Sequence, residues 1–428
     1  DNTALAFDFI GRIDLTKEIP SYNFNANLQR ANLNAMNLTE DTIIVKAKMD
    51  VNATGKNIDD ITGAANLHPV ILRKPGHFVR LDSITFASEQ SAAERNIQIR
   101  TSEFAIGMNG NFIPSQITST IITIARKYFP GIPLTPDSVS SNQNIHLSLT
   151  TEKVDSLVNF FIPKATGFDS STFELTFNNN NNSLSALGYF PLCSYANFDL
   201  KKTTLSLSNP ADSLQLKLSA DELVLNDSIH FPKPNVTAKI ANDAVYLNTL
   251  LSSADKQDQL NMNLVVNGKN KRLIVHILPT TKLLLQNENW NVSDNDTLIY
   301  GKHYVRIKNF KLTNKNQTLV IKDIIPQGDI GLRFEMKNLG FQNFYRFVKT
   351  NKYKVNGLVD ANVNLLNIFG KMAFTGDGNI RKLTLNKDSL GAFNFAASNN
   401  SADGRINLTA SLNGNAYDVK AKGYYSTT

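Results

Sequence analysis

The sequence has one cysteine, one tryptophan and no long apolar run. Because Cys193 stands alone, an internal disulfide framework and any metal site built from several cysteines are excluded. No stretch of about 18 or more apolar residues occurs, so we expect no helix of this chain to span a bilayer. Strand–helix alternation and a glycine-rich dinucleotide loop are also missing, which excludes a doubly wound α/β fold.

Side chains that could perform chemistry are scattered along the chain. The six histidines never stand four residues apart, as a helical zinc pair requires, and no Gly-x-Ser-x-Gly elbow occurs. Asp59-Asp60 and Asp294-Asn295-Asp296 lack the downstream Gly and Glu of an EF-hand loop, so turns explain them better. Trp290 could stack on a sugar, but we interpret it as a packed strand residue. We therefore predict a protein that is not an enzyme and that needs neither a metal nor a cofactor.

Basic residues outnumber acidic residues, and the formal net charge is +7. The basic residues occur in separated pairs, for example Arg126-Lys127, Lys201-Lys202 and Arg381-Lys382. A nucleic-acid interface would concentrate basic side chains and place stacking aromatics among them. We therefore assign these residues to solvated strand faces and predict no nucleic-acid partner.

Period-two alternation dominates the sequence and is clearest between Val355 and Tyr425. Apolar residues occupy every second position in five successive runs, which begin near Val355, Phe374, Phe393, Ile406 and Tyr417. Side chains alternate between the two faces of a strand, so each run predicts a strand with one apolar and one polar face. The same alternation starts at Leu5, and we predict about twenty to twenty-five strands in a long antiparallel sheet. The fold class is therefore mainly β.

Three short segments follow a helical period instead. Their apolar positions are Ile117, Ile121, Ile124 and Tyr128 in the first, Val154, Leu157, Val158 and Phe161 in the second, and Phe341, Phe344, Tyr345 and Val348 in the third. We divide the chain into segments 1–131, 132–310 and 311–428, each with one helix, the second near 152–162 and the third near 341–349. The helices either fill part of the apolar face or plug a groove, and their shortness favours filling.

Several strand motifs together resemble a known family. They are Gly357-Leu358-Val359-Asp360-Ala361-Asn362, Phe374-Thr375-Gly376-Asp377-Gly378 and Ile406-Asn407-Leu408-Thr409-Ala410-Ser411-Leu412-Asn413-Gly414, with a parallel set at Ile58–Ala65 and Leu81–Phe86 and further similarity at Asn289–Ser293 and Asp296–Tyr300. On these motifs the chain resembles the TamB branch of the AsmA-like proteins, and it is most similar to the versions found in Bacteroidota.

The resemblance implies a long sheet rolled into an elongated open groove, a β-taco, in the periplasm of a Gram-negative cell. It also implies an inner-membrane anchor in a segment absent from this chain, which starts within a predicted strand and which we interpret as a piece of a longer protein. The function that it implies is non-catalytic conduction of phospholipids between the inner and outer membranes, in support of outer-membrane biogenesis. A BamA/TamA-like outer-membrane barrel protein would be the partner, through parts not in this chain.

Such a groove needs an apolar lining for acyl chains and a polar outer surface. We expect phospholipid acyl chains to contact the apolar positions of the strands, namely Leu5, Phe7, Phe9, Tyr22, Phe24, Val45, Ala47, Met49, Leu216, Leu264, Val359, Val363, Phe393, Phe395, Ile406 and Leu408. Two other functions stay open. One is a scaffold that offers sheet edges to outer-membrane proteins during their assembly, and the other is a closed β-sandwich adhesin or glycan-binding protein.

Overall fold

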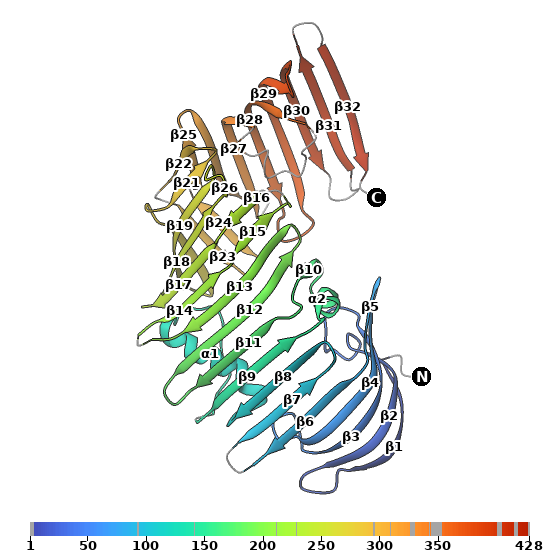
Figure 1. Cartoon of the computed structure of the whole chain (residues 1–428). Helices are drawn as coiled ribbons and strands as arrows, with labels where there is room; N and C mark the ends of the chain where they lie inside the picture. The colour runs from blue at the N-terminus through green and yellow to red at the C-terminus, as the bar shows by residue number, and fades with distance from the viewer. Residues whose placement is uncertain are drawn as a thin grey trace. The chain divides into compact units, whose positions relative to one another are not determined.

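The computed structural model is mainly β: its described residues form one open antiparallel sheet of 32 strands, with two α-helices (Figure 1). The prediction of a long antiparallel sheet is thereby confirmed. The structure describes the chain except for residues 1–3, 92–93, 141, 211, 228, 294–295, 309, 326–329, 342, 344–352, 400–404, 415–417 and 427–428. No helix within that part of the chain is long and apolar enough to cross a membrane.

Unit 1, the first of two compact units, comprises residues 1–128 and 134–223. Its strands pair antiparallel in the order β1–β2–β3–β4–β6–β7–β8–β9–β11–β12–β13–β14. The short strands β5 and β10 pair with β4 and β12. The bounds are β1 (Leu5–Asp14), β2 (Ser21–Asn32), β3 (Ile44–Thr54), β4 (Thr62–Lys74), β5 (His77–Leu81), β6 (Ile84–Gln90), β7 (Arg95–Arg100), β8 (Phe104–Gly110), β9 (Asn144–Thr151), β10 (Ala165–Thr166), β11 (Thr172–Asn178), β12 (Ser183–Tyr195), β13 (Phe198–Ser208) and β14 (Leu214–Ser219).

Unit 2 comprises residues 129–133 and 224–428. Strands β17 to β19 pair in chain order, and so do β25 to β32. The strand β15 (Glu222–Leu225) contains the unit boundary in sequence. The other bounds are β16 (Ile229–Pro232), β17 (Asn235–Ala241), β18 (Ala244–Ser252), β19 (Gln259–Lys269), β20 (Arg272–Ile277), β21 (Lys282–Leu285), β22 (Glu288–Val292), β23 (Thr297–Gly301), β24 (Tyr304–Lys308), β25 (Phe310–Asn314), β26 (Gln317–Ile324), β27 (Gly331–Gly340), β28 (Val355–Leu366), β29 (Ala373–Leu385), β30 (Asp388–Asn399), β31 (Arg405–Asn413) and β32 (Asp418–Ser426).

The described strands number 32, more than the sequence analysis predicted. The excess comes from short strands such as β10, with two residues, and β15, β16 and β21, with four residues each. Strands of that length place at most two side chains on each face, too few to reveal alternation. The longer runs were located correctly, since the five runs predicted between Val355 and Tyr425 are β28 to β32.

Three hairpins of unit 2 turn through two residues that both have positive φ. The pairs are Asn242-Asp243 between β17 and β18 (53° and 58°), Asn270-Lys271 between β19 and β20 (54° and 57°), and Gln286-Asn287 between β21 and β22 (51° and 62°). Two positive φ values are typical of the type I′ turn, whose twist matches that of the strands it joins. These short turns therefore fix the register of the strands on either side.

The first predicted helix is present as α1 (Ile117–Tyr128), which follows the 3₁₀ turn η1 (Pro114–Gln116). Ile124 and Tyr128 of its predicted apolar face are buried. The third helix, predicted near 341–349, lies largely outside the described residues.

The second predicted helix is α2 (Asp155–Phe161), but its buried face differs from the prediction. Phe160 is only 2% exposed, whereas Phe161, which the sequence analysis placed inward, is 54% exposed. Consecutive residues of a helix point about 100° apart, and in a helix of seven residues either phenylalanine can complete an apolar face. Val154, also assigned to that face, is buried but precedes the helix as its N-cap.

A contact between two glycines holds the segment that follows α1 against β19. A Cβ atom on Gly268 would lie 1.9 Å from the carbonyl oxygen of Gly131. The Gly131 N–H also donates to Asp243 Oδ1 at 2.6 Å. Glycine at both positions permits this approach of the two backbones.

Replacing Gly268 by alanine should therefore destabilise unit 2 by about 1–3 kcal/mol, as overpacking usually does. The matched control is Gly423→Ala in β32, where an added Cβ meets nothing within 4 Å. Urea unfolding of the two variants measures the difference. Equal stability of Gly268→Ala and Gly423→Ala would show that the close approach of Gly131 is not a constraint.

Candidate functional site

The apolar face of the sheet in unit 1 is continuous across twelve strands. Direct partners in an antiparallel pair point to the same face, so the printed registers can be followed from strand to strand. We call the following set the apolar row of unit 1: Gly11, Phe24, Val51, Ala65, Phe86, Ile99, Ile106, Leu149, Phe173, Gly188, Leu205 and Leu218. All except Gly11 and Gly188 are half-buried. No polar residue interrupts this row.

The opposite face of the same strands is polar. The neighbouring row of partners on that face consists of Arg12, Asn23, Asn52, Ala64, Ala87, Gln98, Gly107, Ser148, Glu174, Leu187, Ser206 and Lys217. Leu187 is the one large apolar member of this row. Unit 1 therefore has one face suited to apolar ligands and one suited to water.

Unit 2 has an equivalent pair of rows. Its apolar row consists of Val292, Leu312, Leu319, Met336, Ala361, Gly378, Phe395, Ala410 and Ala421, across nine strands from β22 to β32. The opposite face has Lys311, Val320, Glu335, Asn362, Asp377, Ala396, Thr409 and Lys422 as partners. The same separation of apolar and polar faces holds in both units.

The residues expected to line a groove lie on these apolar faces. In unit 1, Leu5, Phe7, Phe9, Tyr22, Phe24, Val45, Ala47 and Met49 pair across β1, β2 and β3, and Leu216 pairs with Leu207 further along the sheet. In unit 2, Val359, Val363, Phe393, Phe395, Ile406 and Leu408 pair across β28 to β31, and Leu264 lies on β19. Each set shares one face within its own unit.

Parts of the apolar face are accessible at the first strand of unit 1. Phe7 and Phe9 stack on each other with ring centroids 6.0 Å apart, yet they are 48% and 47% exposed. Phe393 and Phe395 stack in the same way in unit 2, also at 6.0 Å. Such aromatic ladders leave a flat apolar surface that a ligand can cover.

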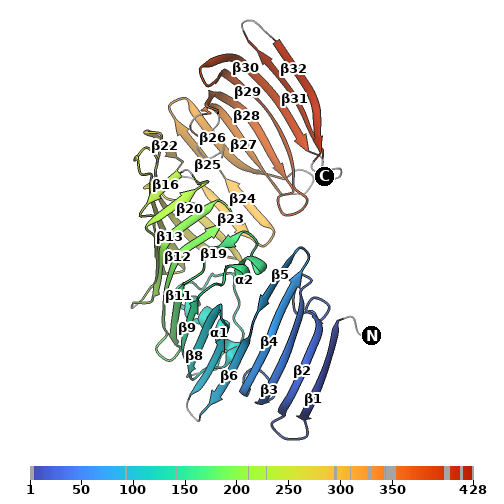
Figure 2. The same cartoon turned by 45° about the vertical axis from the view of Figure 1, so that its right-hand side comes forward.

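Helix α2 covers the apolar face at β3, β4 and β5 (Figure 2). Phe160 packs into a buried cluster with Ala47, Val70, Val79 and Leu81. The Lys74 ammonium lies 5.0 Å from the centre of the Phe160 ring, a favourable cation–π arrangement. The interpretation that a helix fills part of the sheet face therefore applies to α2.

The loop after α2 is fastened to the start of the helix. The Asp155 carboxylate accepts hydrogen bonds from the N–H groups of Gly167 and Phe168, both at 2.6 Å. The Asp155 N–H in turn donates to Asp169 Oδ1 at 3.0 Å. These bonds satisfy donors that a short helix and its loop would otherwise leave open.

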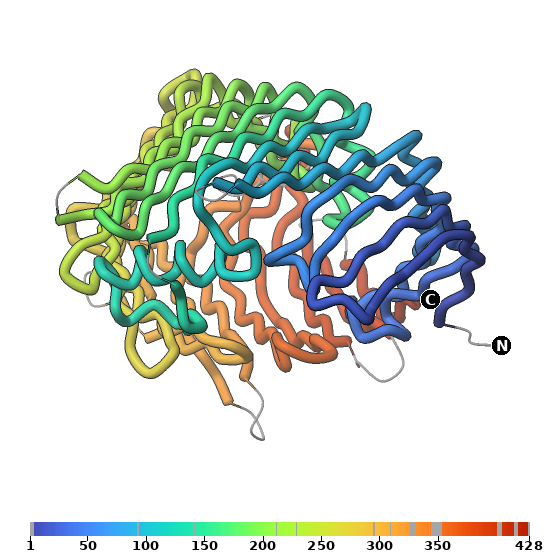
Figure 3. The backbone as a smooth tube through the Cα atoms, turned by 90° about the horizontal axis from the view of Figure 1, so that it is seen from below, coloured from blue at the N-terminus to red at the C-terminus, as the bar shows by residue number. Residues whose placement is uncertain are grey.

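Helix α1 covers a second part of the same face, at one end of β9, β11 and β12. Ile145, Phe177 and Leu184 are cross-strand partners there and all are buried. The Asn209 side chain links them to the helix, since it donates to the Tyr128 hydroxyl at 3.0 Å and accepts the Leu184 N–H at 2.8 Å. Figure 3 shows α1 on one side of the sheet of unit 1.

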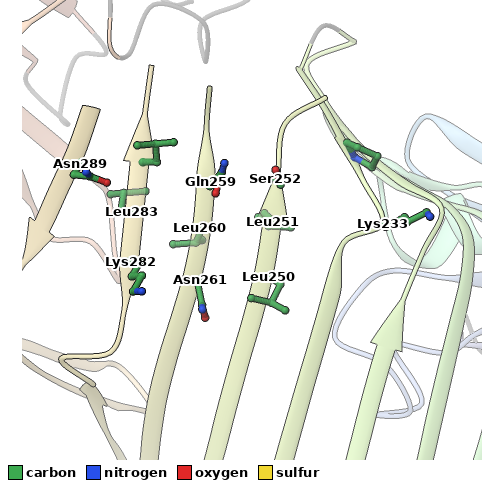
Figure 4. A pocket seen from close by; sticks show the side chains of 12 residues that line it. Lys233, Leu250, Leu251, Ser252, Gln259, Leu260, Asn261, Lys282, Leu283 and Asn289 are labelled. Atoms are coloured by element: carbon green, nitrogen blue, oxygen red, sulfur yellow. The ribbon is translucent and has the colours of Figure 1, made fainter. Parts of the chain in front are cut away.

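A pocket of about 380 Å³ lies on the polar side of unit 2 (Figure 4). Lys233, Gln259, Asn261, Lys282 and Asn289 contribute its polar groups, together with leucines of β18, β19 and β21. Both lysines are exposed, so an anion bound there would gain little. This pocket offers weak polar contacts and no group placed for catalysis.

The acidic pair Asp59-Asp60, considered as a calcium loop, holds turns together, whereas Asp294 and Asn295 of the other candidate lie outside the described residues. Asp60 accepts the N–H groups of Lys56 and Asn57, both at 2.8 Å, and Asp59 accepts the Ser115 N–H at 2.9 Å. The hydrogen bond from Asn57 is the main cause that lowers the pKa of Asp60 below its usual value. Within the described residues, no group of three or more His, Cys, Asp and Glu could hold a metal ion.

The remaining singled-out residues are packed side chains. Trp290 is 3% exposed within the main buried cluster of unit 2, as its interpretation as a strand residue predicted. Cys193 is a free thiol, and burial raises its pKa. A thiol with a raised pKa is a poor nucleophile at neutral pH.

Sequence reasoning missed two features of the apolar face. One is the cover that Phe160 gives to β3–β5, and the other is a branch of the sheet at β19, where Gln259–Asn261 pair with β21 and Leu264–Lys269 pair with β20. The branch has a weak signal in the sequence: the long run Gln259–Lys269 is followed by two short ones, Arg272–Ile277 and Lys282–Leu285.

No protein-family model, curated protein or solved structure matches this chain. The resemblance to the TamB branch therefore stays a prediction from the strand motifs.

Truncating Phe160 should release α2 from the sheet. Phe160→Ala removes a fully buried ring, which typically costs about 3–5 kcal/mol, so the amides of α2 should lose protection in hydrogen exchange. Phe161→Ala is the matched control, because its ring is 54% exposed, and it should leave that protection almost unchanged. Similar exchange in the two variants would contradict the assigned packing of α2.

Proposed function

We propose that this chain is a non-catalytic groove protein of the periplasm that conducts phospholipids between the inner and outer membranes and supports outer-membrane biogenesis. The observation that carries the proposal is the unbroken apolar row in each unit, backed by a polar row on the opposite face. The strand motifs that resemble the TamB branch support the same function. The elongated open groove, the inner-membrane anchor and the BamA/TamA-like partner are parts of this proposal that come from the resemblance.

An apolar row suits the passage of an acyl chain. Covering apolar surface contributes roughly 25 cal/mol per Å², so a chain lying on the row is retained against water. The row of unit 1 crosses twelve strands, about 50 Å at the usual strand spacing. Since the contacts along it are alike, movement from one strand to the next changes the free energy little. Conduction then needs no catalytic group in this chain.

A scaffold for outer-membrane protein assembly is the second candidate, because the sheet is open and not closed on itself. β32 pairs with β31 in the described structure, and all nine of its residues are exposed. An edge strand presents unpaired N–H and C=O groups to which a further strand can add. The open sheet gives less support to the closed β-sandwich adhesin, whose apolar faces would cover each other.

Photo-crosslinking in cells that make the full-length protein separates these functions. A diazirine amino acid at Phe9, Phe24 or Phe395 should capture phospholipid. The matched positions Asp8, Asn23 and Asn394 precede these residues in sequence and face the other way, so they should capture at least about tenfold less, a difference of about 1.4 kcal/mol or more.

Equal lipid capture on the two faces would contradict conduction along the apolar rows. Capture of unfolded outer-membrane polypeptide at Tyr424 of β32, without lipid at Phe9, Phe24 or Phe395, would instead establish the scaffold.

A further inference from the structure

The strands of unit 1 end at two rims of the sheet. Six antiparallel pairings lead from β4 through β6, β7, β8, β9 and β11 to β12, so β4 and β12 run in the same direction. The C-terminal ends of β4 and β12 therefore lie at one rim. The β4–β5 turn, the end of α2 and the β12–β13 turn lie at the same rim, and Figure 1 shows α2 beside β5 and β10 there.

Three segments at this rim are joined to one another. The Lys74 ammonium at the β4–β5 turn lies 5.0 Å from the centre of the Phe160 ring of α2. Strand β10, which follows α2, pairs with the last two residues of β12. The Ala196 N–H in the β12–β13 turn donates to the Lys164 carbonyl at 3.1 Å. We call the three segments together the aromatic rim, and they are residues 73–78, 160–164 and 195–198.

Large apolar side chains of the aromatic rim are exposed. The exposed fraction is 71% for Phe78, 54% for Phe161, 55% for Ile162, 58% for Tyr195 and 56% for Phe198. Tyr195 and Phe198 are the last cross-strand pair of the β12–β13 hairpin, so their rings share one face at its tip. Exposed apolar side chains that gather at neighbouring turns indicate an interaction site.

The opposite rim of the same strands is polar and acidic. The β11–β12 turn at that rim contains five successive asparagines, residues 178–182. Asp59 and Asp60 precede β4 there, and Glu89 and Glu94 flank the β6–β7 turn. Pairing in a sheet separates its two faces but does not require its two rims to differ. The difference therefore indicates that the two rims meet different surroundings.

The aromatic rim also carries positive charge. Its three segments contain Arg73, Lys74 and Lys164 but no aspartate or glutamate. Asp199, which follows the third segment, lies on the other face of β13 from the rings at the hairpin tip. The Asp155 carboxylate of α2 already accepts two backbone N–H groups. The charge of the aromatic rim is thus complementary to an anionic surface.

A bilayer surface fits these side chains better than a small ligand or a stable protein partner. Aromatic rings gather at the level of lipid head groups, and Lys and Arg beside them attract anionic lipids. A small ligand requires a concave site, whereas the rings of the aromatic rim stand out from three turns. Side chains of this size bury about 150–250 Å² when fully covered. Five of them, already partly buried, offer less than the roughly 800 Å² per partner of a stable protein interface.

We propose that the aromatic rim inserts into the surface of an anionic lipid bilayer. Its exposed rings and Ile162 lie among the head groups and the first carbons of the acyl chains, and its basic side chains meet lipid phosphates. The polar rim at the other end of the strands stays in water. This interface needs no lipid on the apolar rows and therefore goes beyond the proposed function.

Flotation of the purified chain with lipid vesicles tests the proposal. The native chain should float with vesicles of phosphatidylcholine and phosphatidylglycerol, and less with phosphatidylcholine alone or at high salt, which screens the basic side chains. The double variant Tyr195→Ser, Phe198→Ser should bind at least about tenfold more weakly. The matched control is Leu187→Ser, Tyr189→Ser, which removes exposed side chains (54% and 42%) from β12 away from the rim. It should float as the native chain does.

Insertion is measured separately with phospholipids brominated on the acyl chains, which quench tryptophan on contact. They should quench Phe198→Trp and leave Leu187→Trp unquenched, since Trp290 is 3% exposed and gives the same background in both variants. This pair decides the test should circular dichroism show that the double variant at the rim does not fold.

Four results would overturn the assignment. They are no flotation of the native chain, equal flotation of the two double variants, equal quenching at positions 198 and 187, and a dimer without flotation that the rim variant abolishes. The last result would assign the aromatic rim to a second copy of this chain.

The outcomes for the aromatic rim and for the proposed function are separable. Lipid capture at Phe9, Phe24 or Phe395 without flotation overturns the rim assignment and leaves conduction in place. Flotation that the rim variant abolishes, with no preference of captured lipid for either face of the sheet, supports the rim and contradicts conduction.

Discussion

Antiparallel pairing in register is the constraint on which the rest of this structure depends. Each strand alternates apolar and polar side chains, and direct partners share a face, so the faces stay separate only while the register holds. A slip of one residue in one strand would turn its apolar side chains to the wet face. The apolar rows and the sites covered by the two helices follow from this registration.

β-Bulges keep apolar residues on one face where they shift from even to odd positions in the sequence. Tyr22, Phe24, Ala26 and Leu28 occupy even positions of β2, whereas Ala31 is odd and still shares their face, because the pairing shifts between Leu28 and Ala31. The same happens in β27 between Met336 and Leu339, which pair with Ala361 and Val359. An extra unpaired residue is how a strand changes parity without changing face.

These particulars explain what the sequence could and could not predict. Long alternating runs such as Ile44–Thr54 determine which side chains share a face, and the expected lining residues were found on common faces for that reason. The predicted buried face of α2 was wrong, because either of two adjacent phenylalanines, Phe160 or Phe161, can complete the apolar face of a helix of seven residues. The branch at β19 arises because this one strand pairs with both β20 and β21. Alternation within a strand shows which side chains share a face, but it does not show which strands pair.

Within the proposed function, the helices fill some parts of the apolar face, and other parts stay accessible to a lipid. Phe160 of α2 and Tyr128 of α1 fill two parts of the face in unit 1, while Phe7 and Phe9 remain accessible.

Lipid mass spectrometry of the chain, purified without detergent from cells with a phospholipid-rich envelope, tests the central claim most directly. The account predicts that at least one phospholipid per chain is extracted. A chain that is folded by circular dichroism and yet yields no phospholipid would contradict it.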